Sequence, residues 1–137
     1  MKTAVIYTRV STLRQAEEGH SLDAQEQEVL QYAKNKGMDV LRVFREEGKS
    51  GKNNNREELK EMLTFAKQNQ VETLLVYKLS RLSRKVSGLL HIIEELSSYG
   101  THVEFVNDGI DTSNQMGKLI TTILGAVAEM ERENILE

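Results

Sequence analysis

Residues 3–12, TAVIYTRVST, decide how the rest of the chain is interpreted. Ala4, Val5 and Ile6 are consecutive apolar residues, as expected of a strand that is covered on both faces. This strand then runs into a guanidinium at Arg9 and a hydroxyl at Ser11, where a buried strand would normally give way to a turn. Because strand side chains alternate, Tyr7, Arg9 and, if the strand extends that far, Ser11 lie on one face.

Strand and helix patterns alternate along the remaining sequence. Strand patterns occupy residues 3–8, 39–44, 71–77 and 102–107, and helical patterns occupy residues 21–36, 56–69, 86–100 and 114–137. Gly37 and Gly100 stand where helices commonly end. The alternation predicts an α/β fold, a three-layer structure with a mostly parallel sheet flanked by helices and a long C-terminal helix.

Composition narrows the function classes. The chain has 137 residues, which suits a single domain over residues 1–137, and its hydrophobic and charged fractions of 39% and 28% are those of an ordinary soluble protein. It has no cysteine, which excludes disulfides and thiol catalysis, and its three histidines are far apart, so no metal site and no cofactor are expected. No stretch resembles a signal peptide or a membrane span, so we expect a cytoplasmic protein without a membrane partner.

Charge is unevenly distributed along the chain. The formal net charge is −3, yet KLSRLSRK, residues 78–85, contains four cations and no acid. This run, Ser11 and the loop EEGKSGKNNNREEL, residues 46–59, all follow predicted strands. In open parallel sheets ligands bind beyond the carboxyl ends of the strands, so these three stretches are expected to converge.

The converging stretches contain one hydroxyl nucleophile, Ser11, and four arginines: Arg9, Arg56, Arg81 and Arg84. Arginine suits phosphate because its planar group donates two parallel hydrogen bonds and stays charged. Each residue alone has an ordinary interpretation, since a serine after a strand is usually a turn residue and an arginine-rich run is usually a solvated face. Their joint placement favours a phosphate site.

Several motifs in order resemble one family. They are YTRVST (7–12), SLDAQ (21–25), SG (50–51) with Arg56 five residues later, LSRLSR (79–84), NDGIDT (107–112) and MGKLITTILGAVAEMERENILE (116–137). Together they resemble the catalytic domain of serine site-specific recombinases, the resolvase/invertase family. The long stretch between Ser11 and Ser21 is similar to that of large serine recombinases, which include phage integrases and transposon recombinases.

This resemblance implies site-specific recombination of double-stranded DNA. Ser11 would attack a phosphodiester and form a 5′-phosphoserine intermediate, and the four arginines would be active-site residues. Gln25 and Ser50 match supporting polar residues of the family, and Tyr7 and Glu47 are further candidates. Two departures concern carboxylates: Ser80 stands where the family often has Asp, and Glu47 stands where it often has Asp after the second strand.

The reaction is expected to need neither metal nor ATP. Attack on a phosphodiester builds negative charge that the arginines can stabilise, and a covalent serine–phosphate link conserves the energy needed for rejoining. No histidine neighbours Ser11 in the sequence, so the arginines are also candidates for stabilising its alkoxide.

The last predicted helix, residues 114–137, has apolar residues spaced by four, three, four and three: Met116, Ile120, Ile123, Val127 and Met130. This spacing is typical of a coiled-coil seam, although a long core helix is an alternative. By resemblance the seam would form a homodimer that assembles into a homotetramer, and the helix would lead to a separate DNA-binding region that is absent here. The fragment alone would then bind DNA poorly.

Two other functions remain open at this point. One is a catalytically inactive dimerisation or regulatory module of the same fold, against which Ser11 and all four arginines argue. The other is a flavodoxin-like nucleotide or phosphate binder, because one fold class hosts many functions. The absence of a glycine-rich phosphate loop after YTRVST disfavours the second.

Overall fold

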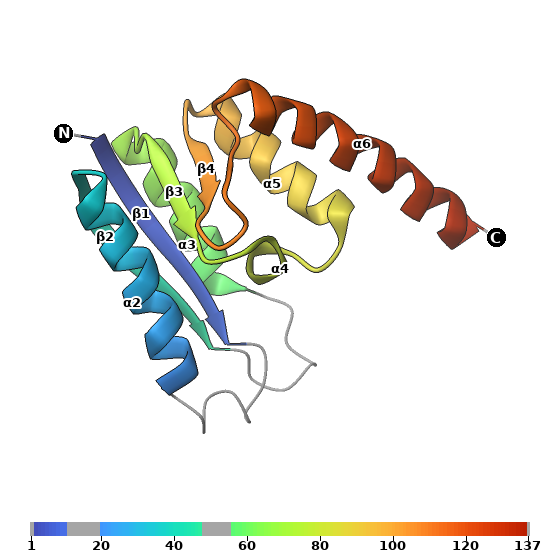
Figure 1. Ribbon diagram of the computed structural model, residues 1–137. Coiled ribbons are helices and arrows are strands. Elements are labelled where there is room, and N and C mark those ends of the chain that lie inside the picture. Colours follow the sequence, from blue (N-terminus) through green and yellow to red (C-terminus); the bar gives the residue numbers. More distant parts are fainter. Residues whose placement is uncertain (1, 11–19, 48–55, 137) are drawn as a thin grey trace.

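A five-stranded sheet forms the centre of the protein, seen in a computed structural model that describes residues 2–10, 20–47 and 56–136 (Figure 1). The strands are β1 (Lys2–Val10), β2 (Met38–Glu47), β3 (Thr73–Val76), β4 (His102–Phe105) and β5 (Ile110–Asp111), in the order β2-β1-β3-β4-β5. The first four are parallel and β5 is antiparallel to β4. The predicted α/β fold with a mostly parallel sheet is confirmed.

Helices cover both faces of the sheet (Figure 1). Helix α2 (His20–Asn35) packs on one face, and α3 (Glu57–Asn69) and α5 (Val86–Ser98) pack on the other. Helix α4 (Leu79–Leu82) is a single turn between β3 and α5. Helix α6 (Gln115–Leu136) packs against α5 and extends beyond the sheet (Figure 1).

The apolar run in β1 follows from this three-layer arrangement. Val5 and Tyr7 pack on the side of α3 and α5, whereas Ala4 and Ile6 pack on the side of α2. All four side chains are fully buried. An inner parallel strand contacts helices on both faces, which explains why its sequence is continuously apolar rather than alternating.

A β-bulge in the edge strand β2 sets which of its side chains face α3. The register with β1 shifts between Ala4 and Val5, whose partners are Val40 and Arg42, and this leaves Leu41 as the extra residue. After the bulge Phe44 lies beside Tyr7 in the α3 layer, and Glu46 pairs with Arg9. The bulge therefore brings Glu46 to the carboxyl edge of the sheet on the same side as α3.

The helices end close to the predicted residues. Gly37 and Gly100 adopt φ values of 70° and 84°, the left-handed conformation that closes a helix. The short elements α4 and β5 were not predicted, and β1 extends two residues past the predicted strand end at Thr8. In the part of the chain that the structure describes, no helix is long and apolar enough to cross a membrane.

Candidate active site at the arginine edge of the sheet

The carboxyl ends of β1 and β2 meet the start of α3, and we call this place the arginine edge. Arg9 lies one residue before the end of β1, beside Glu46 of β2. Arg56 is the N-cap residue of α3. Residues from three separate segments therefore converge, as the sequence predicted for Arg9 and Arg56.

Tyr7 is the buried centre of this group. Its hydroxyl donates a hydrogen bond to Glu46 Oε1 at 3.1 Å and accepts one from Arg56 Nη2 at 3.2 Å. The Arg56 guanidinium carbon also lies 5.7 Å from the centre of the Tyr7 ring. Burial raises the pKa of Tyr7 to about 12, so the phenol stays protonated and can serve both partners.

Glu46 closes the amino end of α3. Its carboxylate accepts the backbone N–H of Glu58 at 3.3 Å and of Leu59 at 3.1 Å. These are among the first N–H groups of the helix, which have no partner within the helix itself. A carboxylate on a neighbouring strand thus replaces the local N-cap side chain, because the side chain of the N-cap residue Arg56 makes no such bond.

Arg56 has a strained backbone and connects two helices. Its φ and ψ are 45° and 54°, a left-handed conformation that costs a non-glycine residue about 1 kcal/mol or more. Its Nη2 donates to the carbonyl of Leu82, the last residue of α4. The guanidinium of Arg56 therefore links the start of α3 to the helical turn that carries Arg81.

Arg81 and Arg84 do not share one helix. Arg81 belongs to α4, which ends at Leu82, and Arg84 lies between α4 and α5. The backbone of Ser83 is extended, with φ −161° and ψ 142°, so the helical turn cannot continue to Arg84. The two arginines would share a face only within one continuous helix, and α4 ends before Arg84.

The pKa of Arg9 is influenced by two of the other arginines. Burial lowers the pKa of Arg9, and the positive charges of Arg56 and Arg84 lower it further. The buried Nε atoms of Arg9 and Arg56 have no hydrogen-bond partner among the described residues. Like charges held together in this way are stabilised by an anion, and a phosphodiester is an anion whose oxygens match guanidinium groups.

The remaining predicted residues have different outcomes. Ser11 and Ser50 lie outside the described residues, as does the side chain of Glu47, whose backbone ends β2. Gln25 is half-buried in α2, on the opposite face of the sheet, and makes no hydrogen bond to the arginines in the described part of the chain. Glu46 was not predicted, because the direction of its side chain depends on the β-bulge at Leu41, which no local sequence pattern reveals.

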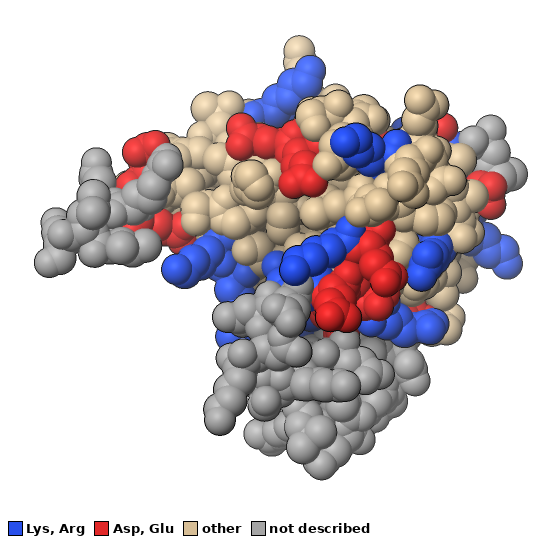
Figure 2. Space-filling model, turned by 180° about the vertical axis from the view of Figure 1, so that it is seen from behind, with Lys and Arg blue, Asp and Glu red and all other residues tan. Residues whose placement is uncertain are grey.

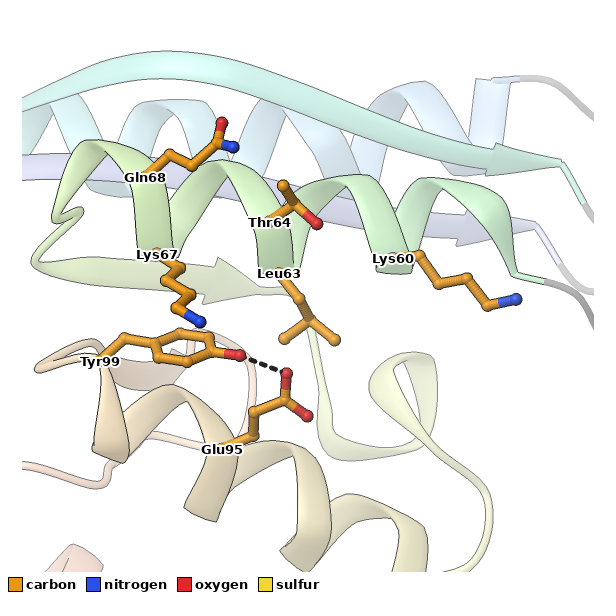
Figure 3. Close-up of a pocket in the computed structure, with 7 residues that line it drawn as sticks. All are labelled: Lys60, Leu63, Thr64, Lys67, Gln68, Glu95 and Tyr99. Carbon is orange, nitrogen blue, oxygen red and sulfur yellow. Dashed lines mark hydrogen bonds between the residues drawn. The ribbon is translucent and has the colours of Figure 1, made fainter.

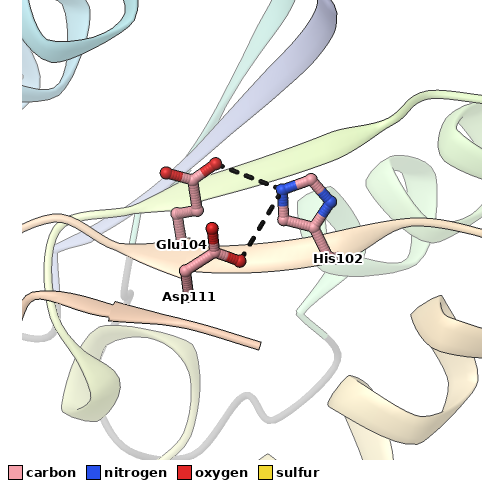
Figure 4. A group of neighbouring side chains, drawn as sticks. All are labelled: His102, Glu104 and Asp111. Atoms are coloured by element: carbon pink, nitrogen blue, oxygen red, sulfur yellow. Dashed lines mark hydrogen bonds and ion pairs between the residues drawn. The ribbon is translucent and has the colours of Figure 1, made fainter. Parts of the chain in front are cut away.

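A second polar cluster lies on β4 and β5 (Figure 4). His102 Nε2 is 3.2 Å from Glu104 Oε2 and 3.8 Å from Asp111 Oδ1, and Tyr32 donates a hydrogen bond to Glu104. Burial acts to raise the pKa of Glu104, but the hydrogen bonds from His102 and Tyr32, together with the electrostatic effects of His102 and Lys2, outweigh it, so this pKa is lowered. The three side chains could hold a metal ion, but they already pair with one another and none belongs to the arginine edge.

A groove of about 650 Å³ lies between α3 and α5 (Figure 3). Its lining residues are Lys60, Leu63, Thr64, Lys67, Gln68, Glu95 and Tyr99. Tyr99 donates a hydrogen bond to Glu95 Oε2 at 2.5 Å, and Lys67 Nζ is 5.6 Å from the Tyr99 ring centre. None of the arginines discussed above lines this groove, so it is separate from the candidate active site.

Figure 2 shows lysine and arginine side chains interspersed with acidic ones on the face turned away in Figure 1. This mixture agrees with the formal net charge of −3. The cations that could hold a phosphate are therefore distinguished by their convergence at the arginine edge.

Comparisons with known proteins all point to one family. The family described as "Resolvase, N terminal domain" matches residues 4–137. Transposon Tn3 resolvase of Escherichia coli is 38% identical over 131 residues, which are 96% of this chain and 64% of the relative. DNA-invertase hin of Salmonella typhimurium is 45% identical over 96 residues, 70% of this chain and 49% of the relative. The chain thus spans less than two thirds of these curated relatives.

Solved structures agree with the sequence comparisons. A resolvase family site-specific recombinase from Streptococcus pneumoniae superimposes with a TM-score of 0.88 at 36% identity, covering 98% of this chain and 91% of that one. The N-terminal catalytic domain of TP901-1 integrase superimposes with a TM-score of 0.81 at 36% identity, covering 96% and 98%. Both similarities extend over nearly all of this chain.

Proposed function

Because this chain belongs to the resolvase family of serine site-specific recombinases, we propose that it cleaves and rejoins double-stranded DNA at specific sites. Ser11 is the proposed nucleophile, and Arg9, Arg56, Arg81 and Arg84 are the proposed phosphate-binding residues. Tyr7, Gln25, Ser50 and Glu47 are retained as proposed supporting residues. A DNA substrate supports a cytoplasmic location for this activity.

The proposed reaction exchanges one phosphodiester for another. The Ser11 oxygen bonds to phosphorus, the bond from phosphorus to the 3′ oxygen breaks, and the serine proton is transferred to the 3′ oxygen through solvent or a neighbouring group. A 5′-phosphoserine and a free 3′-hydroxyl result. The reverse attack by a 3′-hydroxyl of another strand rejoins the DNA, and the conserved bond energy removes any need for ATP.

The observation that carries this proposal is the convergence of Arg9 and Arg56 at the arginine edge, where Arg56 Nη2 donates to the Tyr7 hydroxyl at 3.2 Å. The pKa of Arg9 is lowered by burial and then by Arg56 and Arg84, which supports a site prepared for a polyanionic transition state. Fixed guanidinium groups can stabilise the non-bridging oxygens, which is the task that metal ions perform in many nucleases. We therefore expect EDTA to leave covalent-adduct formation unchanged.

The test uses the complete gene product and a pool of short DNA duplexes with randomised centres. Covalent protein–DNA adducts are trapped in detergent, and the trapped DNA is sequenced to define the substrate. Ser11→Ala should abolish the adduct while the thermal unfolding curve stays unchanged, and Ser97→Ala, an exposed serine of α5, should behave as wild type. An adduct that survives Ser11→Ala would overturn the assignment.

The alternative function is an inactive dimerisation or regulatory module of the same fold. It predicts that the wild-type protein forms no adduct with any duplex in the pool.

Under the proposed function α6 contributes a homodimer interface that assembles further into a homotetramer. Its apolar residues Met116, Ile123 and Met130 are 64%, 53% and 61% exposed, which supports a surface available to a second copy.

A further inference from the structure

Three helices at or next to the arginine edge have their amino ends closed by carboxylates that are remote in sequence. Glu46 closes α3, as described above. Asp108, in the turn after β4, accepts the N–H of Leu79 at 2.8 Å and closes α4. Glu131, on α6, accepts the N–H of Val86 at 3.3 Å and of Ser87 at 3.1 Å and closes α5.

The residues at the three N-cap positions explain why remote carboxylates are needed. They are Arg56, Lys78 and Lys85, and none makes a side-chain capping bond. A cation at the amino end of a helix cannot accept an N–H hydrogen bond and faces the positive end of the helix dipole. The sequence therefore places cations where stability favours Ser, Asp or Asn, a local conflict typical of functional sites.

The turn that carries Arg81 is fixed from both ends. At its start, Asp108 holds the N–H of Leu79, and at its end Arg56 holds the carbonyl of Leu82. Leu82 itself is fully buried. A four-residue helix has little stability of its own, so these two contacts fix the orientation from which Arg81 projects.

The segment that carries Arg84 is next to a helix start that a different element closes. Arg84 lies two residues before Val86, the first residue of α5, whose N–H is bound by Glu131. Because Glu131 belongs to α6, the long helix contributes to the conformation of the segment that carries Arg84.

We propose that Asp108 and Glu131 are positioning residues for the cleavage reaction, acting through the amino ends of α4 and α5 on Arg81 and Arg84. This inference rests on the proposed function. Neither carboxylate needs to touch DNA. Loss of either cap lets an arginine-bearing segment relax, and small misplacements of groups that stabilise a transition state lower the rate strongly.

The experiment compares Asp108→Ala with Asp108→Asn, and Glu131→Ala with Glu131→Gln. Asp108 accepts its hydrogen bond through one carboxylate oxygen, and asparagine keeps one such oxygen. Glu131 accepts through both of its carboxylate oxygens, and glutamine keeps only one of them. Asp39→Ala and Glu94→Ala remove exposed carboxylates elsewhere and serve as matched controls. Adduct formation is measured at saturating DNA, using the duplex selected by the wild-type protein, alongside thermal unfolding and amide hydrogen exchange.

The two alanine variants should form adduct about tenfold more slowly or worse at saturating DNA, with the fold retained. Asp108→Asn should restore nearly the full rate, and Glu131→Gln should restore part of it. Exchange of the Leu79 amide should accelerate in Asp108→Ala, and exchange of the Val86 and Ser87 amides in Glu131→Ala.

Alanine variants that form adduct as fast as the controls would overturn the inference while leaving the proposed function intact. Alanine and amide variants that are slowed equally would also overturn it, because charge and not capping would then be responsible. If the wild-type protein itself forms no adduct, the proposed function fails, and the inference fails with it.

Discussion

Glu46 connects three groups at the arginine edge. It accepts hydrogen bonds from the Tyr7 hydroxyl and from two backbone N–H groups of α3. The sequence instead pointed to its neighbour Glu47 as the carboxylate of interest. The bulge at Leu41 decides which β2 side chains face α3, and no local sequence pattern reveals it. The choice between Glu46 and Glu47 could therefore not be made from sequence.

Replacing Glu46 should destabilise the protein measurably. Glu46→Ala removes the cap of α3 and leaves the buried Tyr7 hydroxyl without its acceptor, which should lower the free energy of unfolding by about 2 kcal/mol. Urea denaturation provides the measurement. Glu28→Ala, which removes an exposed glutamate of α2, should change stability by less than about 0.5 kcal/mol. Equal stabilities for the two variants would refute the capping role.

Tyr7 should titrate later than an ordinary tyrosine. Its pKa is raised to about 12, so folding favours the protonated phenol. Because the pKa of Tyr7 is higher in the folded protein than in the unfolded chain, the stability that Tyr7 contributes is present below pH 10. This stability is lost as the pH rises through about 12. An ultraviolet absorbance titration of wild type and Tyr7→Phe should differ by one late-titrating phenol. A difference centred near pH 10 would contradict the buried hydrogen-bonded position.

At the scale of elements, two glycines of α6 differ in the space available for a larger side chain. A Cβ at Gly117 would lie 1.8 Å from the carbonyl oxygen of Asp111, whereas at Gly125 its nearest neighbour would be Leu90 Cδ2 at 3.8 Å. Gly117→Ala should therefore lower the free energy of unfolding by about 2 kcal/mol or more through overpacking. Gly125→Ala should be neutral or stabilise by up to about 1 kcal/mol, because alanine favours the helix.

Both variants are measured by thermal and urea unfolding. The comparison controls for helix propensity, since the same change is made twice in one helix. A Gly117→Ala protein as stable as Gly125→Ala would show that the start of α6 does not pack tightly on Asp111. The close approach of Gly117 to the Asp111 carbonyl would then not determine where α6 leaves the sheet.

Strands β1 to β4 and the four long helices were predictable from sequence, whereas α4 and β5 were not. The four strands are marked by apolar runs and the long helices by helical apolar periodicity, which reflect burial in the protein. Helix α4 and strand β5 contain four and two residues, too few to show a period, and remote contacts such as that of Asp108 with Leu79 hold them. Hence the convergence of Arg9 and Arg56 was predictable, whereas the separation of Arg81 from Arg84 was not.

At the scale of the whole molecule, the sheet order gathers charges from distant segments while α6 leaves an apolar surface uncovered. In the predicted seam, Ile120 and Val127 are half-buried, and Met116, Ile123 and Met130 are exposed. A helix that used its whole apolar surface within its own domain would not expose residues at heptad spacing.

Self-association through this surface is testable by sedimentation velocity. The wild-type chain should associate reversibly as its concentration rises, and Ile123→Glu should shift it to monomer by placing a charge in the seam. Gln115→Glu, at an exposed polar position of the same helix, should associate as wild type does. A wild-type chain that stays strictly monomeric at high concentration would contradict the proposed interface.

The central claim is that a serine hydroxyl, assisted by clustered arginines, forms a covalent bond to DNA. The most direct measurement is mass spectrometry of the peptide left on DNA after trapping and digestion, carried out with EDTA present. The account predicts a nucleotide linked through phosphate to Ser11, with the link on the 5′ end of the broken strand. A link at any other residue, a link to a 3′ end, or loss of the adduct with EDTA would contradict it.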